Sequence, residues 1–312
     1  MLEQLGFNMV TIPLPFRLNH VNCFIAEGEN GYIIIDTGLN NEDASKVWNE
    51  VIENKPIEKI IITHLHPDHY GYAGELQQLT NAPVSITKID AETAKYVWED
   101  QPLKALKEDY SRSNVPEKIA DGIIDITKQF VPYVSPLPSV EHYFNEGDMI
   151  YLSGNCYEVI FTPGHSDGLI CLYNKEKNVL FSTDHILPKI TPNISYWFYG
   201  KENPLSDYEK SLQKIKELNA EFVIPSHGMP FHHANERIDQ IWAHHLERFD
   251  MTLEALEKVN SVFEVCHYLF EQELNVYEYQ FAIGETLAHL EYLRGKGECA
   301  RELIGGKWYY SK

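Results

Sequence analysis

Short apolar runs alternate with helical patterns along the first 230 residues of the chain. The runs are rich in β-branched and aromatic side chains and are bounded by turn residues, which is typical of strands. The predicted strands are 7–14, 21–26, 32–35, 57–63, 84–86, 149–152, 157–162, 169–173, 179–182 and 222–225. The predicted helices between them are 42–53, 68–79 and 206–218, the last with Ser206 as its N-cap. Strands that alternate with helices predict an α/β protein.

Two regions depart from this alternation. Residues 88–140 predict a mainly helical insert, and the chain after about residue 230 predicts three helices and then a hairpin around Gly305-Gly306. The expected helices are 89–99, 102–110 and 116–130 in the insert, and 233–258, 261–270 and 279–294 in the tail. Three helices and a hairpin resemble a small winged-helix-like module. We therefore expect a main domain at 1–230 and a C-terminal domain at 231–312.

The segment after the predicted strand 57–63 carries the strongest chemical signal in the chain. It reads His64-Leu65-His66-Pro67-Asp68-His69, with three imidazoles and one carboxylate within six positions. Imidazole nitrogen and carboxylate oxygen suit Zn²⁺, Fe²⁺ and Mn²⁺. Water bound to such an ion ionises near neutral pH and becomes a nucleophile. The segment therefore predicts a metal-dependent hydrolase, with a solvated histidine-rich loop as the alternative.

Three later strands also end in residues of the metal-ligand type. His165, Asp184 and His227 each follow directly after a predicted strand. The carboxyl ends of strands are where α/β sheets bind ligands, so residues that are distant in the sequence converge there. The joint pattern favours a metal site over isolated loop residues. We interpret His185, next to Asp184, as a residue that supports this site or the fold.

Composition narrows the classes of partner. The chain has 312 residues, a net charge of -20 and no cluster of Lys and Arg, so its surface repels nucleic acid. Its five cysteines are scattered, as free thiols of a reducing compartment are. We see no signal peptide and no apolar stretch of the roughly 20 residues that would span a bilayer. We therefore expect a cytoplasmic protein with no membrane partner.

These motifs, in this order, resemble the metallo-β-lactamase superfamily over roughly residues 7–228. The resemblance implies an αββα sandwich that holds two divalent ions, with Zn as the first choice and Fe or Mn as alternatives. The implied ligands are His64, His66 and His165 for one ion, Asp68, His69 and His227 for the other, and Asp184 as a bridge. Asp36, which closes an early strand, would orient groups of the metal site without binding the ions.

The resemblance also suggests a mechanism, in which a hydroxide that bridges the two ions attacks a carbonyl. Asp68 is placed to accept a hydrogen bond from the hydroxide and to help move a proton to the leaving group. With Asp184, it makes up the expected catalytic pair. The metal motifs resemble those of glyoxalase II-type thioesterases and of lactonases, so we favour a small acyl thioester, ester or lactone as the substrate.

Aromatic side chains supply the candidate substrate pocket. They lie in the segment after Asp184 and are Tyr196, Trp197, Phe198 and Tyr199. Aromatic walls suit an acyl or other apolar group. The alternative is that these rings only pack the insert onto the main domain. A glutathione or coenzyme A leaving group would need a basic contact, and the sequence shows no cluster that supplies one.

Two other functions remain open. RNA- or phosphodiester-cleaving enzymes of the same superfamily share the metal motifs, although the acidic charge disfavours RNA. The winged-helix-like tail also allows a DNA-binding regulator with a vestigial hydrolase domain, but its predicted recognition helix 279–294 is not basic. We expect instead that the tail packs against the insert or forms a homodimer contact.

Overall fold

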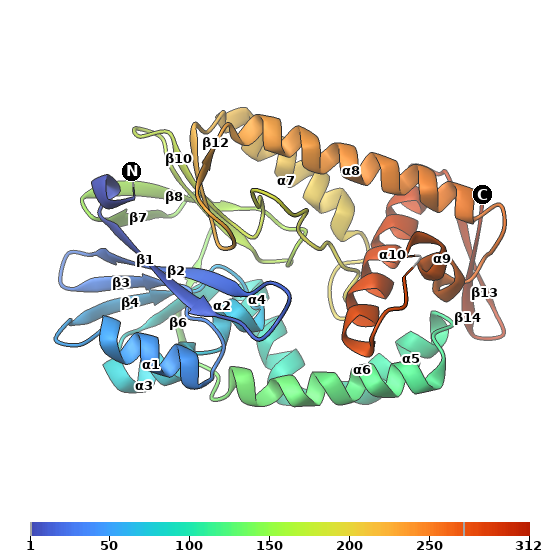
Figure 1. Ribbon diagram of the computed structural model, residues 1–312, viewed down its shortest axis with the longest axis horizontal. Coiled ribbons are helices and arrows are strands. Elements are labelled where there is room, and N and C mark those ends of the chain that lie inside the picture. Colours follow the sequence, from blue (N-terminus) through green and yellow to red (C-terminus); the bar gives the residue numbers. More distant parts are fainter. Residues whose placement is uncertain (1, 271) are drawn as a thin grey trace.

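Two six-stranded sheets face each other at the centre of the molecule (Figure 1). The computed structural model describes residues 2–270 and 272–312. The first sheet runs in chain order and comprises β1 (Phe7–Pro13), β2 (His20–Glu27), β3 (Tyr32–Ile35), β4 (Ile57–Ile61), β5 (Val84–Thr87) and β6 (Val140–Phe144). Its β1–β2 and β2–β3 pairs are antiparallel, whereas β3 to β6 pair in parallel.

The second sheet is built by later parts of the chain. In spatial order it comprises β12 (Phe231–His232), β11 (Phe222–Pro225), β10 (Val179–Thr183), β9 (Ile170–Asn174), β8 (Asn155–Phe161) and β7 (Met149–Leu152). Phe181 of this sheet meets Phe7 and Phe24 of the first, with ring centroids 4.6 and 5.2 Å apart. The burial of these apolar faces from water holds the two sheets together.

Helices cover the outer faces of both sheets, as Figure 1 shows. The helices of the first half are α1 (Glu42–Val51), α2 (Pro67–Tyr70) and α3 (Ala73–Thr80), and those over the second sheet are α7 (Pro204–Leu218) and α8 (Ala234–Ala255). Trp48 of α1 is fully buried beneath the first sheet, and Leu212 of α7 is buried beneath the second. The predicted αββα sandwich is confirmed.

The insert between β5 and β6 is helical, as predicted. It contains α4 (Lys88–Ala94), a π-helical turn (Lys95–Asp100), α5 (Leu103–Arg112), α6 (Glu117–Phe130) and a 3-10 turn (Val131–Val134); another such turn is at Glu3–Leu5. The sequence analysis missed β6, because three of its five side chains are exposed at the sheet edge and leave no apolar alternation. The insert thus ends where the sequence analysis placed its end, at about residue 140, and β6 follows it.

Two helix starts differ from the prediction. The helix expected at 68–79 is divided into α2 and α3, and Gly74 lies so close to the carbonyl of Pro136 that a side chain would collide with it. Helix α7 begins at Pro204, and the side chain of Asn203 caps it by accepting a hydrogen bond from the Ser206 amide. Ser206 as the N-cap was therefore wrong, since proline is favourable at the first helical position.

The C-terminal region consists of α9 (Val262–Leu269), α10 (Val276–Lys296), β13 (Ala300–Ile304) and β14 (Lys307–Ser311), which follow α8. The expected helices and hairpin are therefore present. Ile283 and Leu287 of α10 share one hydrophobic core with Tyr110 and Ile123 of the insert. The tail is thus packed against the insert, while the exact domain boundary at 230 stays a prediction. Within the described ranges, no helix is long and apolar enough to cross a membrane.

Candidate metal centre

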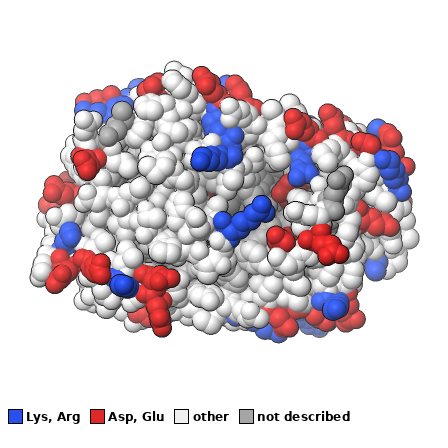
Figure 2. Space-filling model, in the orientation of Figure 1, with Lys and Arg blue, Asp and Glu red and all other residues white. Residues whose placement is uncertain are grey.

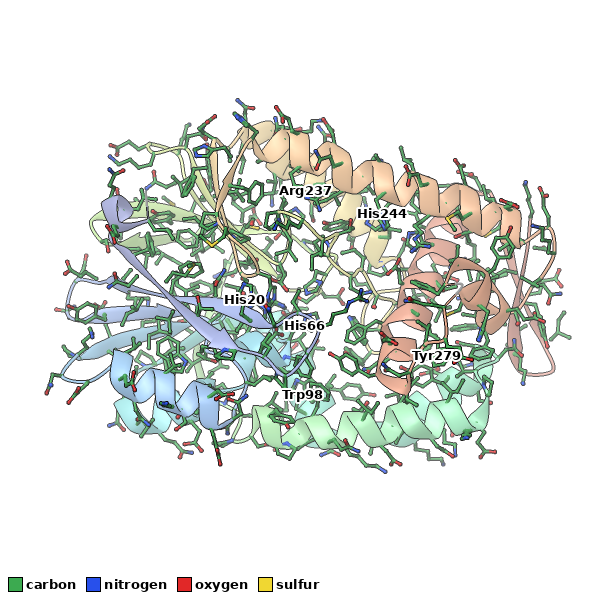
Figure 3. The ribbon with its side chains drawn as sticks, viewed as in Figure 1. His20, His66, Trp98, Arg237, His244 and Tyr279 are labelled. Carbon is green, nitrogen blue, oxygen red and sulfur yellow. The ribbon has the colours of Figure 1, made fainter. Side chains whose placement is uncertain are left out.

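Loops at the ends of four strands bring together all seven predicted ligand residues. In three groups, the candidate ligand atoms lie within 4.8 Å of one another. The groups are His64, His66 and His165; His64, His69 and Asp184; and Asp68, His69 and His227. His66 is near the middle of the molecule, between the labelled His20 and Trp98 (Figure 3). The convergence arises because β4, β8, β10 and β11 all end at this side of the sandwich.

Asp184 lies between the imidazoles that the resemblance assigns to the two ions. The first set is His64, His66 and His165, and the second is His69 and His227. Its Oδ2 atom is 3.4 Å from Nε2 of His165, 3.5 Å from Nε2 of His69 and 3.3 Å from Nε2 of His227. Within the first set, Nδ1 of His66 is 2.8 Å from Nε2 of His165. Imidazole nitrogens and a carboxylate oxygen gathered at these distances have the arrangement of donors around a common cation.

The imidazoles are held from behind by hydrogen bonds on their outer nitrogens. Nδ1 of His69 is 2.8 Å from Oδ2 of Asp36, Nδ1 of His165 donates to the carbonyl of Asn193 at 2.8 Å, and Nδ1 of His227 donates to the carbonyl of His20 at 2.7 Å. Each bond fixes the ring and turns its other nitrogen towards the neighbouring candidate ligands. The inner nitrogens are therefore ready to bind a metal ion.

The donor set fits a divalent ion. Among residues 2–270 and 272–312, Nε2 of His69, Nε2 of His227 and Oδ1 of Asp184 are buried without a hydrogen-bond partner. Such atoms are expensive to bury unless a ligand satisfies them. Burial lowers the pKa of His227, but the Asp184 carboxylate outweighs it, and the pKa rises to about 10. The negative electrostatic potential of the carboxylates therefore favours a positive charge at the centre.

Asp36 fastens the first metal loop to its strand. Its carboxylate accepts hydrogen bonds from the amide and the hydroxyl of Thr63, both at 2.8 Å, and also contacts His69. Its backbone has a φ of 59°, in the left-handed region that Asn and Asp tolerate better than most residues. The structure thus places Asp36 behind the candidate ligand His69, and its role in orienting that ring stays a prediction.

Replacing Asp36 by asparagine is expected to weaken metal binding about ten- to a hundredfold, because partners of this kind orient the ligating ring. Asparagine keeps the backbone conformation, but its single acceptor oxygen cannot accept from the Thr63 amide and from His69 together, because these donate to different oxygens of Asp36. Competition with a chromophoric zinc chelator measures the affinity. The exposed Asp43→Asn on α1 serves as the control. Equal affinity in the two variants would contradict the role given to Asp36.

Family models place this constellation among known proteins. The model described as the metallo-beta-lactamase superfamily matches residues 17–227. The chain belongs to the metallo-beta-lactamase superfamily. A second model, described as the metallo-beta-lactamase-like C-terminal domain, matches residues 249–311. The superfamily match covers the whole span from the β1–β2 loop to His227 and includes each of the three candidate donor groups.

Relatives and a solved structure agree with this assignment. A probable metallo-hydrolase of Bacillus subtilis is 25% identical over 96% of this chain and 94% of that protein. An atrochrysone carboxyl ACP thioesterase of Cryptosporiopsis is 24% identical over 83% of this chain and 66% of that protein. A metallo-beta-lactamase family protein from Thermus thermophilus is 28% identical, with a TM-score of 0.86 and 98% of each chain covered. This chain is thus a metallo-hydrolase of the superfamily with a candidate divalent-metal cluster.

Asp90 connects two of the superfamily's metal loops and was missed by the sequence analysis. It is fully buried and accepts hydrogen bonds from the Leu65 amide at 2.9 Å and from the Ser166 hydroxyl and Gly168 amide at 2.8 Å. Burial raises its pKa to about 6, although these hydrogen bonds act in the opposite direction. In the sequence, Asp90 looks like an ordinary residue of a helix start, because it follows the N-cap Thr87 by three positions.

Asp90→Ala is expected to lower the free energy of unfolding by about 3 kcal/mol or more, because three buried donors lose their acceptor. Urea denaturation measures this loss. Asp90→Asn retains one acceptor oxygen and should lose less. Glu92→Ala on the same helix removes only an exposed ion pair with Lys88 and should change stability by less than about 0.5 kcal/mol. A similar small change for Asp90→Ala would rule out its role as the link between the loops.

The C-terminal domain also reaches a predicted metal ligand. Asn193 contacts both sides: its carbonyl accepts a hydrogen bond from His165, and its side-chain amide donates one to Glu285 of α10 at 3.3 Å. Glu285 in turn is 3.9 Å from Arg248 of α8. Nothing in the sequence pattern connects these residues, which are brought together only by the packing of α10 onto the 187–199 segment.

A cavity of about 350 Å³ opens beside the metal cluster, with His66, Asp68, Asp184 and His227 in its wall. Trp197 and Tyr199 of the predicted aromatic segment also line it. Tyr196 and Phe198 are not part of its wall, and they pack in the core, Phe198 against Tyr110 and Tyr196 against Trp308. We therefore keep only Trp197 and Tyr199 as candidate substrate contacts.

His185 lies outside the three groups of candidate ligands. Its ring is fully buried and packs edge-on against Tyr208 of α7, with centroids 5.2 Å apart. Burial lowers its pKa to about 3, so the ring is neutral. This placement favours a structural role beneath the loop that carries Asp184.

Proposed function

We propose that this protein hydrolyses a carbonyl substrate, namely a thioester, ester or lactone. The reaction uses two divalent ions, for which zinc is the first choice. The position of Asp184 between the two imidazole sets supports a bridged pair of ions. The single observation that carries the choice of a carbonyl substrate is the cavity, which combines the metal cluster with apolar walls. Ions bound there would lower the pKa of water and polarise the substrate carbonyl.

The chain's own groups supply proton transfer. The Asp68 side chain is 19% exposed and lines the cavity, whereas Asp184 is 7% exposed and held among the imidazoles. Asp68 is therefore placed to accept a proton from the attacking water and to deliver it to the leaving group. Burial raises the pKa of the Tyr199 and Tyr277 hydroxyls, so both remain hydrogen-bond donors for the developing oxyanion.

The thioesterase among the relatives supports an acyl substrate, but its identity of 24% leaves the substrate open. Nucleic acid fits less well, because the chain carries a net charge of -20. Helix α10, the expected recognition helix of a DNA-binding tail, is buried at residues 282–284 and 286–293. A helix packed on most sides cannot enter a groove of DNA, which disfavours the regulator hypothesis.

A substrate panel tests the proposal. Purified protein loaded with Zn²⁺ should hydrolyse at least one simple thioester, ester or lactone, measured by thiol release or acid production. Bis(4-nitrophenyl) phosphate is the matched phosphodiester substrate. Cleavage of the phosphodiester with no turnover of a carbonyl substrate would replace our proposal by the phosphodiesterase alternative. A cytoplasmic location and a homodimer stay predictions.

A further inference from the structure

The walls of the cavity are assembled from four segments that are distant in the sequence. Phe16 of the β1–β2 loop stacks on Phe130 of α6 and on Tyr277 of α10, with centroids 5.7 and 5.6 Å apart. In Figure 1 the β1–β2 loop points towards α10, with α6 running beneath both. A stack of aromatic rings therefore closes one side of the cavity, and all three rings line it.

A second group of rings lies against the metal cluster itself. Trp197 stacks on Tyr199 with centroids 5.8 Å apart and meets Phe281 of α10 edge-on at 6.2 Å. The same indole is 6.1 Å from the ring of His66. Apolar side chains of the insert, Val97, Leu103 and Leu106, complete this wall. A group bound beside the metal centre would thus be surrounded by apolar surface.

Arg17 is the one arginine in the wall of this cavity, and no lysine lines it, as far as the structure describes the chain. It is exposed, in the β1–β2 loop. Every other arginine is engaged: Arg112 with Asp109, Arg237 with the carbonyl of Leu187, Arg248 with that of Leu269, and Arg294 and Arg301 with Glu291. Arg17 makes no such contact within residues 2–270 and 272–312, so its guanidinium is available to a ligand.

The charge of the surface supports an anionic ligand at this place. The protein as a whole carries a net charge of -20 and repels anions at long range. On the face shown in Figure 2, however, Lys and Arg side chains lie at the rim of the central hollow, with acidic side chains to one side of it. An anion that enters this hollow therefore passes basic side chains at its rim.

From these observations we infer that the substrate is a thioester with an extended apolar acyl chain and a leaving thiol that carries a phosphate or carboxylate, which Arg17 binds. This inference rests on the proposed function. The acyl chain occupies the aromatic cavity, because burying apolar surface there is favourable. A large polar thiol cannot be buried between such walls, so it lies at the exposed end, where Arg17 is.

The reaction is balanced by water alone. Water adds its oxygen to the carbonyl carbon, the carbon–sulfur bond breaks, and the proton released by water passes through Asp68 to the departing sulfur. The products are a carboxylic acid and a thiol. Arg17 is a specificity residue in this scheme and not part of the proton path, so its removal should affect binding of the anionic thiol and leave small neutral substrates unaffected.

Calorimetric binding of thioethers, which cannot be hydrolysed, tests the inference. S-octyl coenzyme A carries phosphates, S-octyl glutathione carries carboxylates, and S-octyl N-acetylcysteamine carries neither. At least one anionic thioether should bind more tightly than the neutral one, and the tighter of the two identifies phosphate or carboxylate. The octyl form should bind at least about thirtyfold more tightly than the butyl form, since four methylenes are buried.

Variants at position 17 assign the charge contact. Arg17→Gln should weaken binding of the preferred anionic thioether about five- to tenfold and leave the neutral one unchanged. Arg17→Lys should restore most of the loss. Lys46→Gln, on the outer side of α1, removes the same charge far from the cavity and should have no effect. Melting temperatures of all three variants should match that of the parent protein, because both side chains are exposed.

Equal binding of all three thioethers, no dependence on chain length, or an unchanged affinity in Arg17→Gln would overturn the inference. These binding results do not depend on turnover. If the expected binding is found but no carbonyl compound is cleaved, the proposed function is wrong, whereas the apolar and anionic character of the ligand is supported. If a short neutral ester is cleaved but all thioethers bind equally, the proposed function is supported and the inference about the ligand is wrong.

Discussion

Replacing Asp184 by asparagine is expected to lower kcat by about a thousandfold or more, because it removes a charged group that contacts both sets of imidazoles. Its Oδ2 atom lies within 3.5 Å of ring nitrogens from His69, His165 and His227. Asparagine has nearly the same shape but no charge to offset that of the ions. Metal content, measured by elemental analysis, should fall from two ions per chain to one or fewer.

The matched control for this variant is Asp125→Asn. Asp125 is exposed on α6 and forms an ion pair with the exposed Lys128, so the kcat and metal content of this variant should equal those of the parent protein. Circular dichroism of the Asp184→Asn variant should still show the folded protein, since its side chain has the same volume. Near-normal turnover with two ions bound would show that Asp184 is not part of the metal centre.

Removal of the metal ions is expected to lower the melting temperature by roughly 10 °C or more. A site filled about a thousandfold above its Kd stabilises the fold by about 4 kcal/mol, and there are two proposed sites. Without the ions, the buried carboxylates and imidazoles of the cluster lose their common partner. Scanning calorimetry before and after treatment with a chelator measures the change, and added Zn²⁺ should reverse it.

The control for metal removal is the double variant Asp68→Asn, Asp184→Asn. It lacks both carboxylates of the proposed centre, so chelation should change its melting temperature by only a few degrees. If the parent protein melts at the same temperature with and without the chelator, the cluster does not hold ions that contribute to stability. An equal change in melting temperature on chelation in the parent and the double variant would also show that the two carboxylates hold no stabilising ions.

Much of the fold was predictable because the apolar residues of a strand or helix in the sequence are the ones that the fold buries. Strands such as β10 and β11 are short apolar runs bounded by turns, and buried strands of parallel sheets need that composition. The exposed edge strand β6 was missed, since no buried face imposes a pattern on it. The start of a helix was misplaced where two nearby residues are both of the type that caps helices. Asn203 is the N-cap of α7, whereas the prediction chose Ser206.

The candidate ligands were predictable for a different reason. Ligands need specific donor atoms, and each follows a strand whose end points to the same side of the sheet. His64, His165 and Asp184 are therefore visible as motifs in the sequence. Residues that act through one hydrogen bond behind a ligand have no such restriction. Asp90 and Asn193 look ordinary in the sequence, and only their three-dimensional neighbours distinguish them.

The sequence by itself determined the donor set, its order along the strands and hence the class of chemistry, because ligand type and strand pattern are local properties. The tertiary structure decided what surrounds that centre. The insert and α10 share one hydrophobic core, and Phe16 of the β1–β2 loop stacks on Phe130 and Tyr277, so that the three segments meet beside His66. Their contacts place Phe16, Tyr277 and Arg17 at a single cavity, and such long-range packing has no signature in any one segment of the chain.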